Sequence, residues 1–185
     1  MLTIEPTAIP DVKIVTPRRF GDDRGFFSEI YNQQRFHEAG ITIPFVQDNH
    51  SWSAKPGTVR GLHFQSAPFG QDKLVRVVRG RILDVAVDLR RSSPTYGRHV
   101  AVELSAENWR QLLVPVGFAH GFCTLEPDTE VLYKVSGYYS AQHDHGLAWD
   151  DPMLGIAWPV APSEAVLSDK DQRHPTLAEL PAYFP

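Results

Sequence analysis

Glycine and proline interrupt the sequence at short intervals, and this spacing limits the fold more than any other feature. Fifteen Pro and 13 Gly are distributed along 185 residues rather than gathered in one linker, which favours short segments joined by turns. Many segments are rich in β-branched and aromatic residues, as strands are. The candidate strands are 47–52, 60–65, 73–79, 81–89, 100–104, 110–114, 120–124 and 129–136. Strands of this number and length predict an all-β sandwich or barrel, built as one domain over residues 1–185.

One helix is expected among the strands. Asn32 is a suitable N-cap, and residues 33–39 are compatible with a helix. Gly40 can end the helix because glycine readily adopts the left-handed conformation. The last thirty residues contain five Pro, which predicts an extended segment wrapped over the core.

Strands 73–79 and 81–89 meet at Gly80 and are expected to form a hairpin. Within the second strand, alternation places Asp84 and Asp88 on the same face as apolar neighbours.

The charge distribution argues against a nucleic-acid-binding protein. The net charge is -4, so the whole molecule would not attract a phosphate polymer. Residues 60–98 nevertheless carry eight Lys or Arg against three Asp. A basic segment within an acidic chain suits a small anionic ligand, or else lies on a solvated strand face.

A cytoplasmic protein is expected from two further features. Cys123 is the only cysteine, and the N-terminus lacks the basic start and apolar run of a secretory signal. No run of eighteen apolar residues occurs, so neither a membrane span nor a membrane partner is expected.

Two histidines stand in strand-like sequence and are candidates for chemistry. His63 follows Leu62, and period-two alternation places it on the face opposite Arg60. Such a histidine is either a hydrogen-bonded core side chain or a base that faces a pocket. His120 follows the turn sequence Pro115-Val-Gly117 by three residues, a spacing that also occurs in metal-binding cupins. Gln65 stands where another histidine ligand would be needed, so too few ligands remain and no metal is expected.

Eight strings, in order and at matching spacing, resemble the dTDP-4-dehydrorhamnose 3,5-epimerase family. They run from residue 22 to residue 171 and are DDRGFFSE, FVQDNHS, VRGLHFQ, KLVRVVRG, VPVGFAHGF, LYKVSGYYS, WDDP and LSDKD. The resemblance implies a cupin-type jelly roll (double-stranded β-helix) with a few short helices. It also implies a homodimer without cofactors that converts dTDP-4-dehydro-6-deoxy-D-glucose into dTDP-4-dehydro-L-rhamnose.

This reaction requires an acid and a base on opposite sides of the sugar ring. C3 and C5 are both α to the C4 ketone, so each can lose a proton to give an enolate and regain one on the other face. A neutral imidazole suits the base and a phenol the acid. The resemblance assigns His63 as the base, Asp169 as the carboxylate that orients it, Tyr133 as the acid and Lys73 as the cation beside the C4 oxygen.

A separate set of residues would hold the nucleotide and the sugar. The resemblance places Arg24 and Arg60 on the diphosphate, with the segment from Arg24 to Glu29 serving the partner subunit's site. Tyr139, or Tyr138 beside it, would stack on thymine. The further substrate contacts that it implies are Glu29, Gln47, Asn49, His120, Asp144 and Lys170.

Two positions depart from the family pattern. Phe64 replaces the usual tyrosine, and Asp144 stands where glutamate is more common. Three other functions stay open: an epimerase acting at one centre of a related dTDP-4-keto-6-deoxysugar, a metal-dependent cupin oxygenase, and a non-catalytic module that binds nucleotide sugars. The oxygenase is disfavoured by Gln65, and the module by the presence of acid and base together.

Overall fold

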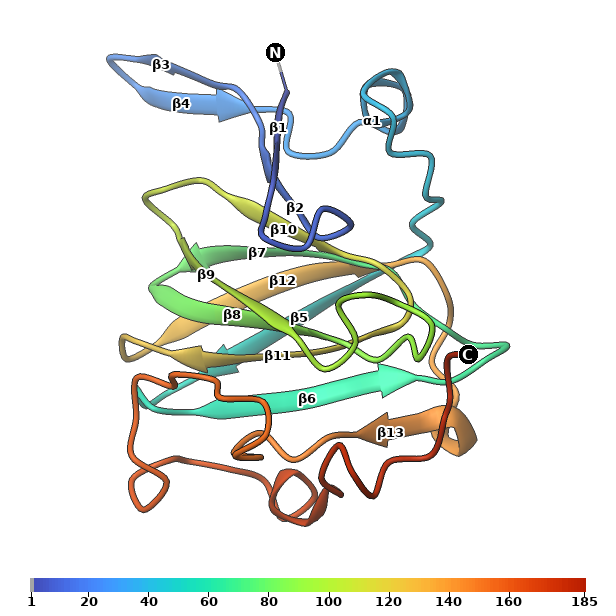
Figure 1. Cartoon of the computed structure of the whole chain (residues 1–185). Helices are drawn as coiled ribbons and strands as arrows, with labels where there is room; N and C mark the ends of the chain where they lie inside the picture. Colours follow the sequence, from blue (N-terminus) through green and yellow to red (C-terminus); the bar gives the residue numbers. More distant parts are fainter. Residues whose placement is uncertain (1) are drawn as a thin grey trace.

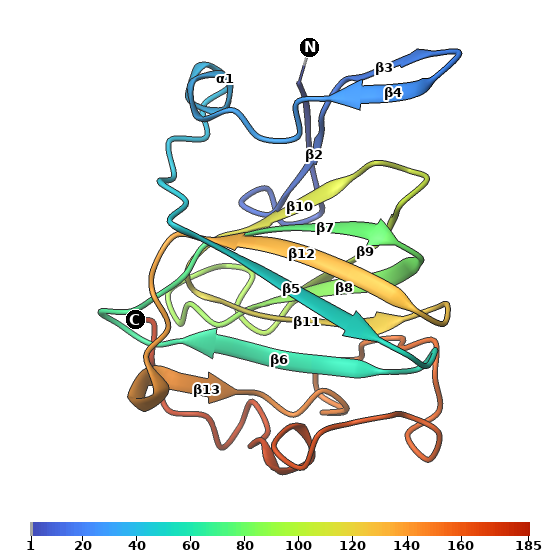
Figure 2. The same ribbon diagram turned by 180° about the vertical axis from the view of Figure 1, so that it is seen from behind.

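Two antiparallel β-sheets face each other across the interior of the protein. The structure is a computed structural model that describes residues 2–185, and Figure 1 and Figure 2 show the two sheets from opposite sides. The first sheet has six strands in the order β1 (Thr3–Pro6), β2 (Lys13–Thr16), β10 (Gln111–Val114), β7 (Lys73–Arg79), β12 (Thr129–Val135) and β5 (Gln47–Ser53). The second has five, in the order β13 (Asp144–Gly146), β6 (Val59–Gln65), β11 (Phe118–Thr124), β8 (Arg81–Asp88) and β9 (His99–Ser105).

The main core lies between the sheets and follows the period-two pattern of the strands. Alternate side chains of β7, such as Val75 and Val77, are buried against Ile82 and Ala86 of β8 and Leu104 of β9. Since successive side chains of a strand point to opposite faces, one apolar face of each sheet suffices to form this core. The prediction of a β-sandwich is confirmed, and each predicted strand occurs within two residues of its predicted ends.

The predicted hairpin around Gly80 is wrong. β7 pairs with β10 and β12 in the first sheet, whereas β8 pairs with β9 and β11 in the second. The chain therefore turns a corner from one sheet to the other at Gly80. The apolar faces of β7 and β8 meet across the core instead of lying side by side.

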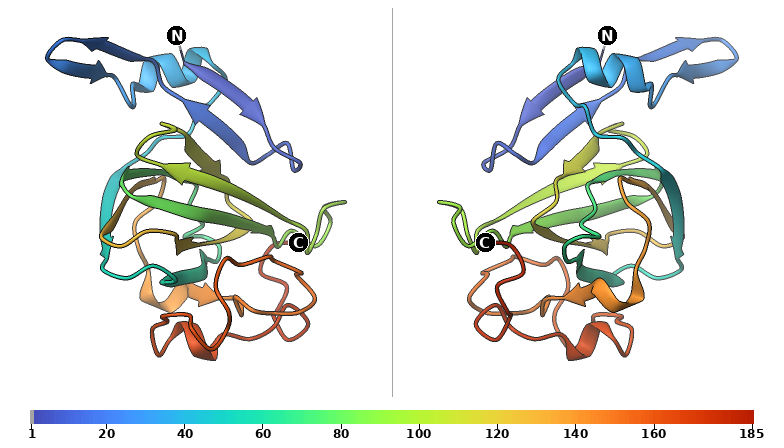
Figure 3. Two further views of the ribbon diagram at one scale, coloured as in Figure 1. Left: turned by 90° about the vertical axis from the view of Figure 1, so that its left-hand side faces the viewer. Right: turned by 90° about the vertical axis from the view of Figure 1, so that its right-hand side faces the viewer.

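The N-terminal part adds a short helix and a projecting hairpin. α1 (Gln33–Glu38) begins at Asn32, whose side chain accepts a hydrogen bond from the backbone N–H of Arg35, as predicted. Phe36 of α1 packs against the outer face of the first sheet. β3 (Arg19–Asp22) and β4 (Gly25–Ser28) form a separate two-stranded hairpin, which extends away from the two sheets in the side views of Figure 3.

The C-terminal segment covers the outer face of the second sheet, as predicted. Leu177, Leu180 and Phe184 are buried against apolar side chains of β6 and β8. The segment contains only one short 3-10 helix, η2 (Asp171–Arg173); another, η1 (Ala141–His143), precedes β13. No helix within residues 2–185 is long and apolar enough to cross a bilayer.

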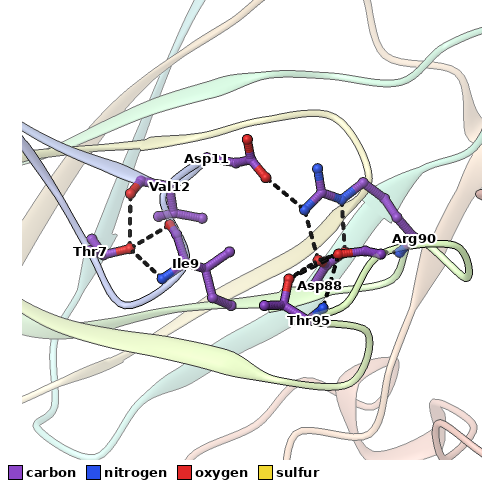
Figure 4. Close-up of polar contacts among 8 residues, drawn as sticks. Thr7, Ile9, Asp11, Val12, Asp88, Arg90 and Thr95 are labelled. Carbon is purple, nitrogen blue, oxygen red and sulfur yellow. Dashed lines mark hydrogen bonds and ion pairs between the residues drawn. The ribbon is translucent and has the colours of Figure 1, made fainter.

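A buried ion pair joins the end of β8 to the N-terminal turn (Figure 4). The guanidinium of Arg90 donates to both carboxylate oxygens of Asp88, at 2.9 and 2.7 Å, and to Asp11 at 2.9 Å. Thr95 donates to the same Asp88 carboxylate at 2.6 Å. Asp88 is fully buried, and these hydrogen bonds hold its pKa at about 2 although burial alone would raise it.

Candidate active site

A polar cavity opens inside the jelly roll and is lined by side chains from strands of both sheets. It consists of two adjoining spaces of about 260 and 460 Å³ that share His63, Lys73, Tyr133 and Lys170 as lining residues. β6 and β7 supply the first two side chains, β12 supplies the third, and the loop before η2 supplies Lys170. Of the four residues proposed as base, orienting carboxylate, acid and cation, His63, Tyr133 and Lys73 line the cavity and Asp169 does not.

A β-bulge in β6 places Arg60 and His63 in the same cavity. His63 pairs with His120 and Arg60 pairs with Phe122, so the two residues Gly61 and Leu62 lie opposite the single residue Gly121. This extra residue reverses the alternation, and the prediction that His63 and Arg60 face opposite sides is wrong. Glycine is required at the bulge, because a Cβ on Gly61 would lie 2.6 Å from the Cα of Gly121.

His63 forms a hydrogen bond with a buried carboxylate, which belongs to Asp171 and not to Asp169. The Nε2 of His63 lies 2.5 Å from Oδ1 of Asp171. Asp171 is 5% exposed, whereas Asp169 is exposed and its backbone carbonyl accepts a hydrogen bond from Arg173. The prediction for Asp169 is therefore wrong by two positions. The backbone N–H of Asp171 donates to the Ser168 hydroxyl at the start of η2, and this turn directs the second aspartate of DKD inward.

The carboxylate determines which nitrogen of His63 is available as a base. Because an ionised carboxylate only accepts hydrogen bonds, the proton resides on Nε2 and leaves Nδ1 with its lone pair. Burial raises the pKa of Asp171, but the hydrogen bond and charge of His63 outweigh it and the pKa lies below its usual value. Asp171 thus stays ionised and can stabilise the imidazolium that forms when Nδ1 takes up a proton.

Lys73 is a half-buried ammonium beside His63. Its Nζ donates to the backbone carbonyl of His63 at 3.3 Å. Burial lowers its pKa to about 8, while the charges of Asp84 and Asp144 oppose that shift. The group therefore remains mostly cationic at neutral pH and has few competing hydrogen-bond partners.

A second imidazole–carboxylate pair lies across from the first. His120 is opposite His63 in the pairing of β11 and β6, and its Nε2 lies 2.8 Å from Oδ1 of Asp84. Burial lowers the pKa of His120, so its neutral form is favoured. Asp84 was not among the predicted site residues, although its place on an apolar face of β8 was a signal that this carboxylate has an internal partner.

Tyr133 lines both parts of the cavity from β12. Burial raises the pKa of its phenol, with the negative charge of Asp144 acting in the same direction and Arg60 acting against it. The phenol is therefore protonated over the whole physiological range and available as a proton donor.

The wider part of the cavity is lined by amide, aromatic and charged side chains. Gln47 and Asn49 of β5 lie there and hydrogen bond to each other at 2.8 Å. Asp144 accepts a hydrogen bond from the Tyr139 hydroxyl at 3.0 Å and forms an ion pair with Lys170. Tyr138 is 68% exposed and is not among the lining residues, so the geometry favours Tyr139 over Tyr138 as the stacking candidate.

Two predicted binding residues lie outside the cavity. Arg24 sits at the tip of the β3–β4 hairpin with its side chain 90% exposed and paired with Asp22. Glu29 contacts Asn32 and Arg35 near α1. Within one chain these residues do not reach His63. Of the basic segment 60–98, only Arg60 and Lys73 line the cavity.

Two of the residues considered as metal ligands from the sequence make hydrogen bonds within the protein. Nε2 of His120 is hydrogen-bonded to Asp84, and Oε1 of Gln65 accepts from the backbone N–H of Ser140. Within residues 2–185, one group of three possible ligands does assemble: His63, Asp171 and His174, whose donor atoms lie within 4.8 Å of one another.

This chain is similar to proteins that are named as epimerases. The family model described as dTDP-4-dehydrorhamnose 3,5-epimerase matches residues 6–179. The enzyme of that name from Sinorhizobium fredii is 56% identical over 177 residues, which is 96% of this chain and 90% of the relative.

Two solved structures extend the similarity to three dimensions. The Bacillus anthracis enzyme, with TDP and pyrophosphate bound, has a TM-score of 0.92 at 54% identity and covers 95% of this chain and 99% of its own. The Legionella pneumophila enzyme, in complex with dTDP-4-keto-L-rhamnose, has a TM-score of 0.93 at 44% identity, over 98% and 96% of the two chains. The predicted cupin-type jelly roll is confirmed by these neighbours, and the chain belongs to the dTDP-4-dehydrorhamnose 3,5-epimerase family.

Proposed function

We propose that the protein inverts C3 and C5 of dTDP-4-dehydro-6-deoxy-D-glucose and so forms dTDP-4-dehydro-L-rhamnose. The observation that carries this proposal is the presence, in one cavity, of the carboxylate-bound imidazole of His63, the protonated phenol of Tyr133 and the half-buried ammonium of Lys73. Together these groups supply a base, an acid and a cation for a developing enolate.

Proton abstraction is the role of His63. Its Nδ1 takes the proton from C3 or C5, each of which is α to the C4 ketone. The electron pair of that C–H bond passes into the enolate, and Asp171 stabilises the imidazolium through Nε2. Asp171 acts on the base and not on the sugar, so it is a positioning residue.

Lys73 and Tyr133 complete the inversion. The Lys73 ammonium stabilises negative charge on the C4 oxygen; one preorganised donor of this kind contributes roughly 3 kcal/mol in comparable sites. Tyr133 then returns a proton to the opposite face of the carbon, and the ketone re-forms with the centre inverted. Repetition at the second carbon gives the L-configured sugar.

The wider part of the cavity suits the nucleotide and the sugar hydroxyls. Arg60 provides a guanidinium for the diphosphate, and Tyr139 an aromatic face for thymine. Gln47, Asn49, His120, Asp144 and Lys170 supply hydrogen bonds from the cavity wall. In the proposed homodimer, the segment from Arg24 to Glu29 of one subunit serves the site of its partner.

The test is an incubation with dTDP-4-dehydro-6-deoxy-D-glucose in deuterium oxide, followed by NMR. We expect deuterium at both C3 and C5 and an L-configured product. Label at one carbon alone identifies a single-centre epimerase. Tight binding of the nucleotide without any label identifies a non-catalytic binding module.

A further inference from the structure

His174 lies against the His63–Asp171 pair, and the proposed epimerisation does not use it. Its Nε2 is 3.4 Å from the same Oδ1 of Asp171 that accepts the hydrogen bond of His63. The two imidazole rings stand edge to face, with centroids 5.5 Å apart. Two imidazoles therefore converge on one carboxylate oxygen.

The position of His174 is built into the fold. The residue follows η2, three positions after Asp171, and its ring packs on Gly146 of β13. A Cβ at Gly146 would lie 2.2 Å from the ring, so only glycine leaves space for the imidazole there. β13 pairs Gly146 directly with His63, which aligns the two histidines.

Within residues 2–185, the buried Nε2 of His174 has no hydrogen-bond partner. The side chain is 8% exposed, and the contact with Asp171 lacks hydrogen-bond geometry. A buried polar nitrogen normally has a partner, because leaving it without one costs free energy. This nitrogen lies close to two other possible ligand atoms, one from His63 and one from Asp171.

We propose that His63, Asp171 and His174 form an inhibitory binding site for a divalent transition metal such as Zn²⁺. Two imidazole nitrogens and one carboxylate oxygen are the protein ligands of many zinc centres that keep a fourth position open. The three donor atoms lie within 4.8 Å of one another. Separations of roughly 3 to 3.5 Å between ligands would accommodate a zinc ion at about 2 Å from each, so short side-chain movements suffice.

Metal binding at this site removes the proposed base. Zn²⁺ accepts the lone pair of Nε2 of His63, and the proton that Nε2 held moves through solvent to Nδ1. An imidazole protonated on Nδ1 cannot take a proton from the sugar, so the epimerase is inactive until the metal leaves. No oxidation or reduction is involved. Mg²⁺ and Ca²⁺ prefer oxygen ligands and should not compete for the site.

The test compares the chelator-treated protein with two variants by calorimetric titration with ZnCl₂. His174→Gln removes one ligand, and His37→Gln removes an exposed histidine on α1 as the matched control. We expect one Zn²⁺ per chain for the wild type and the control, and at least about tenfold weaker binding for His174→Gln. Equal affinity in all three proteins would overturn the proposal. Because the titration measures binding, this result does not depend on the epimerase activity.

Two further measurements connect binding with inhibition. Zn²⁺ should inhibit the wild type reversibly, whereas metal-free His174→Gln should keep its turnover within about threefold and resist Zn²⁺ by at least about tenfold. Inhibition that is equal in both proteins contradicts the proposal. If the variant does not fold, Co²⁺ titration of the wild type decides: paramagnetic shifts of the His63 and His174 imidazole resonances support the site, and their absence rejects it.

Discussion

At the scale of single residues, the carboxylate bound to His63 should determine how well this proposed base works. Asp171→Asn keeps the shape of the side chain but removes the charge that stabilises the imidazolium. We expect the turnover number to fall by about 10²-fold or more, with a smaller change in KM. Asp169→Asn is the matched control and should stay close to the wild type. Steady-state kinetics on both variants checks this prediction, and a larger loss for Asp169→Asn would contradict the assignment.

A variant of Tyr133, the proposed acid, allows proton removal to be measured separately from inversion. In Tyr133→Phe the base is intact, so C3 and C5 should still exchange their protons with solvent. The opposite face of the enolate has lost its proton donor, and formation of the L-configured product should fall by about 10²-fold. NMR in deuterium oxide distinguishes labelled starting sugar from product. If exchange and product formation decrease equally, Tyr133 does not act as the acid.

The residue types of the site could be predicted from the sequence, but not all of their positions. The motif DKD contains two aspartates two residues apart, and only the turn at Ser168 decides which one points inward. No sequence pattern indicated that His174 lies at the site, because its contact with Asp171 depends on how the C-terminal segment folds back onto β13.

At the scale of elements, local patterns predicted the strands better than their partners. The sequence around Gly80 is compatible with a tight hairpin and with a corner between sheets, and only the competing pairings with β10 and β11 decide between them. The local sequence did not predict the bulge at Gly61 either, because the bulge arises from a close approach to Gly121 on another strand. Long-range pairing therefore decides which side of β6 faces the substrate cavity.

The ion pair at the end of β8 should make stability depend on acid pH. The folded pKa of Asp88 is about 2, below an unfolded value of about 3.9. Its stabilisation is thus fully present above about pH 4 and is lost as the pH falls through 2. Asp88→Asn should lower the free energy of unfolding by roughly 2 kcal/mol at pH 7, and by about half of that at pH 3.

Urea unfolding of both proteins at several pH values measures this difference. Asp22→Asn serves as the control, because it removes an Asp–Arg pair that is exposed to solvent and should change stability little. A difference between wild type and Asp88→Asn that does not narrow below pH 4 would show that the carboxylate charge is not the stabilising feature.

At the scale of the whole molecule, the β3–β4 hairpin is the feature that a single chain does not explain. It projects from the sheets (Figure 3) and exposes Phe20, Phe26 and Phe27 by 46%, 57% and 69%. Large apolar side chains gathered on one hairpin indicate a surface that another protein covers. Arg24 at its tip is exposed and does not line the cavity of its own chain, so it could serve the cavity of a second copy. The sequence resemblance predicted this arrangement, and the exposed hairpin supports it.

Mixed dimers provide the decisive test of that arrangement. Arg24→Ala should lower kcat/KM by roughly 10-fold to 100-fold through the loss of a charge-assisted hydrogen bond to phosphate, and His63→Asn should be inactive. If Arg24 acts across the dimer, a mixed dimer of the two variants contains one site with both groups intact. Random co-assembly in equal amounts should then restore about a quarter of the wild-type activity, since half of the dimers are mixed and each has one working site. If Arg24 acts within its own chain, the mixture cannot exceed the average of the two parents, because no site then contains both an intact Arg24 and an intact His63.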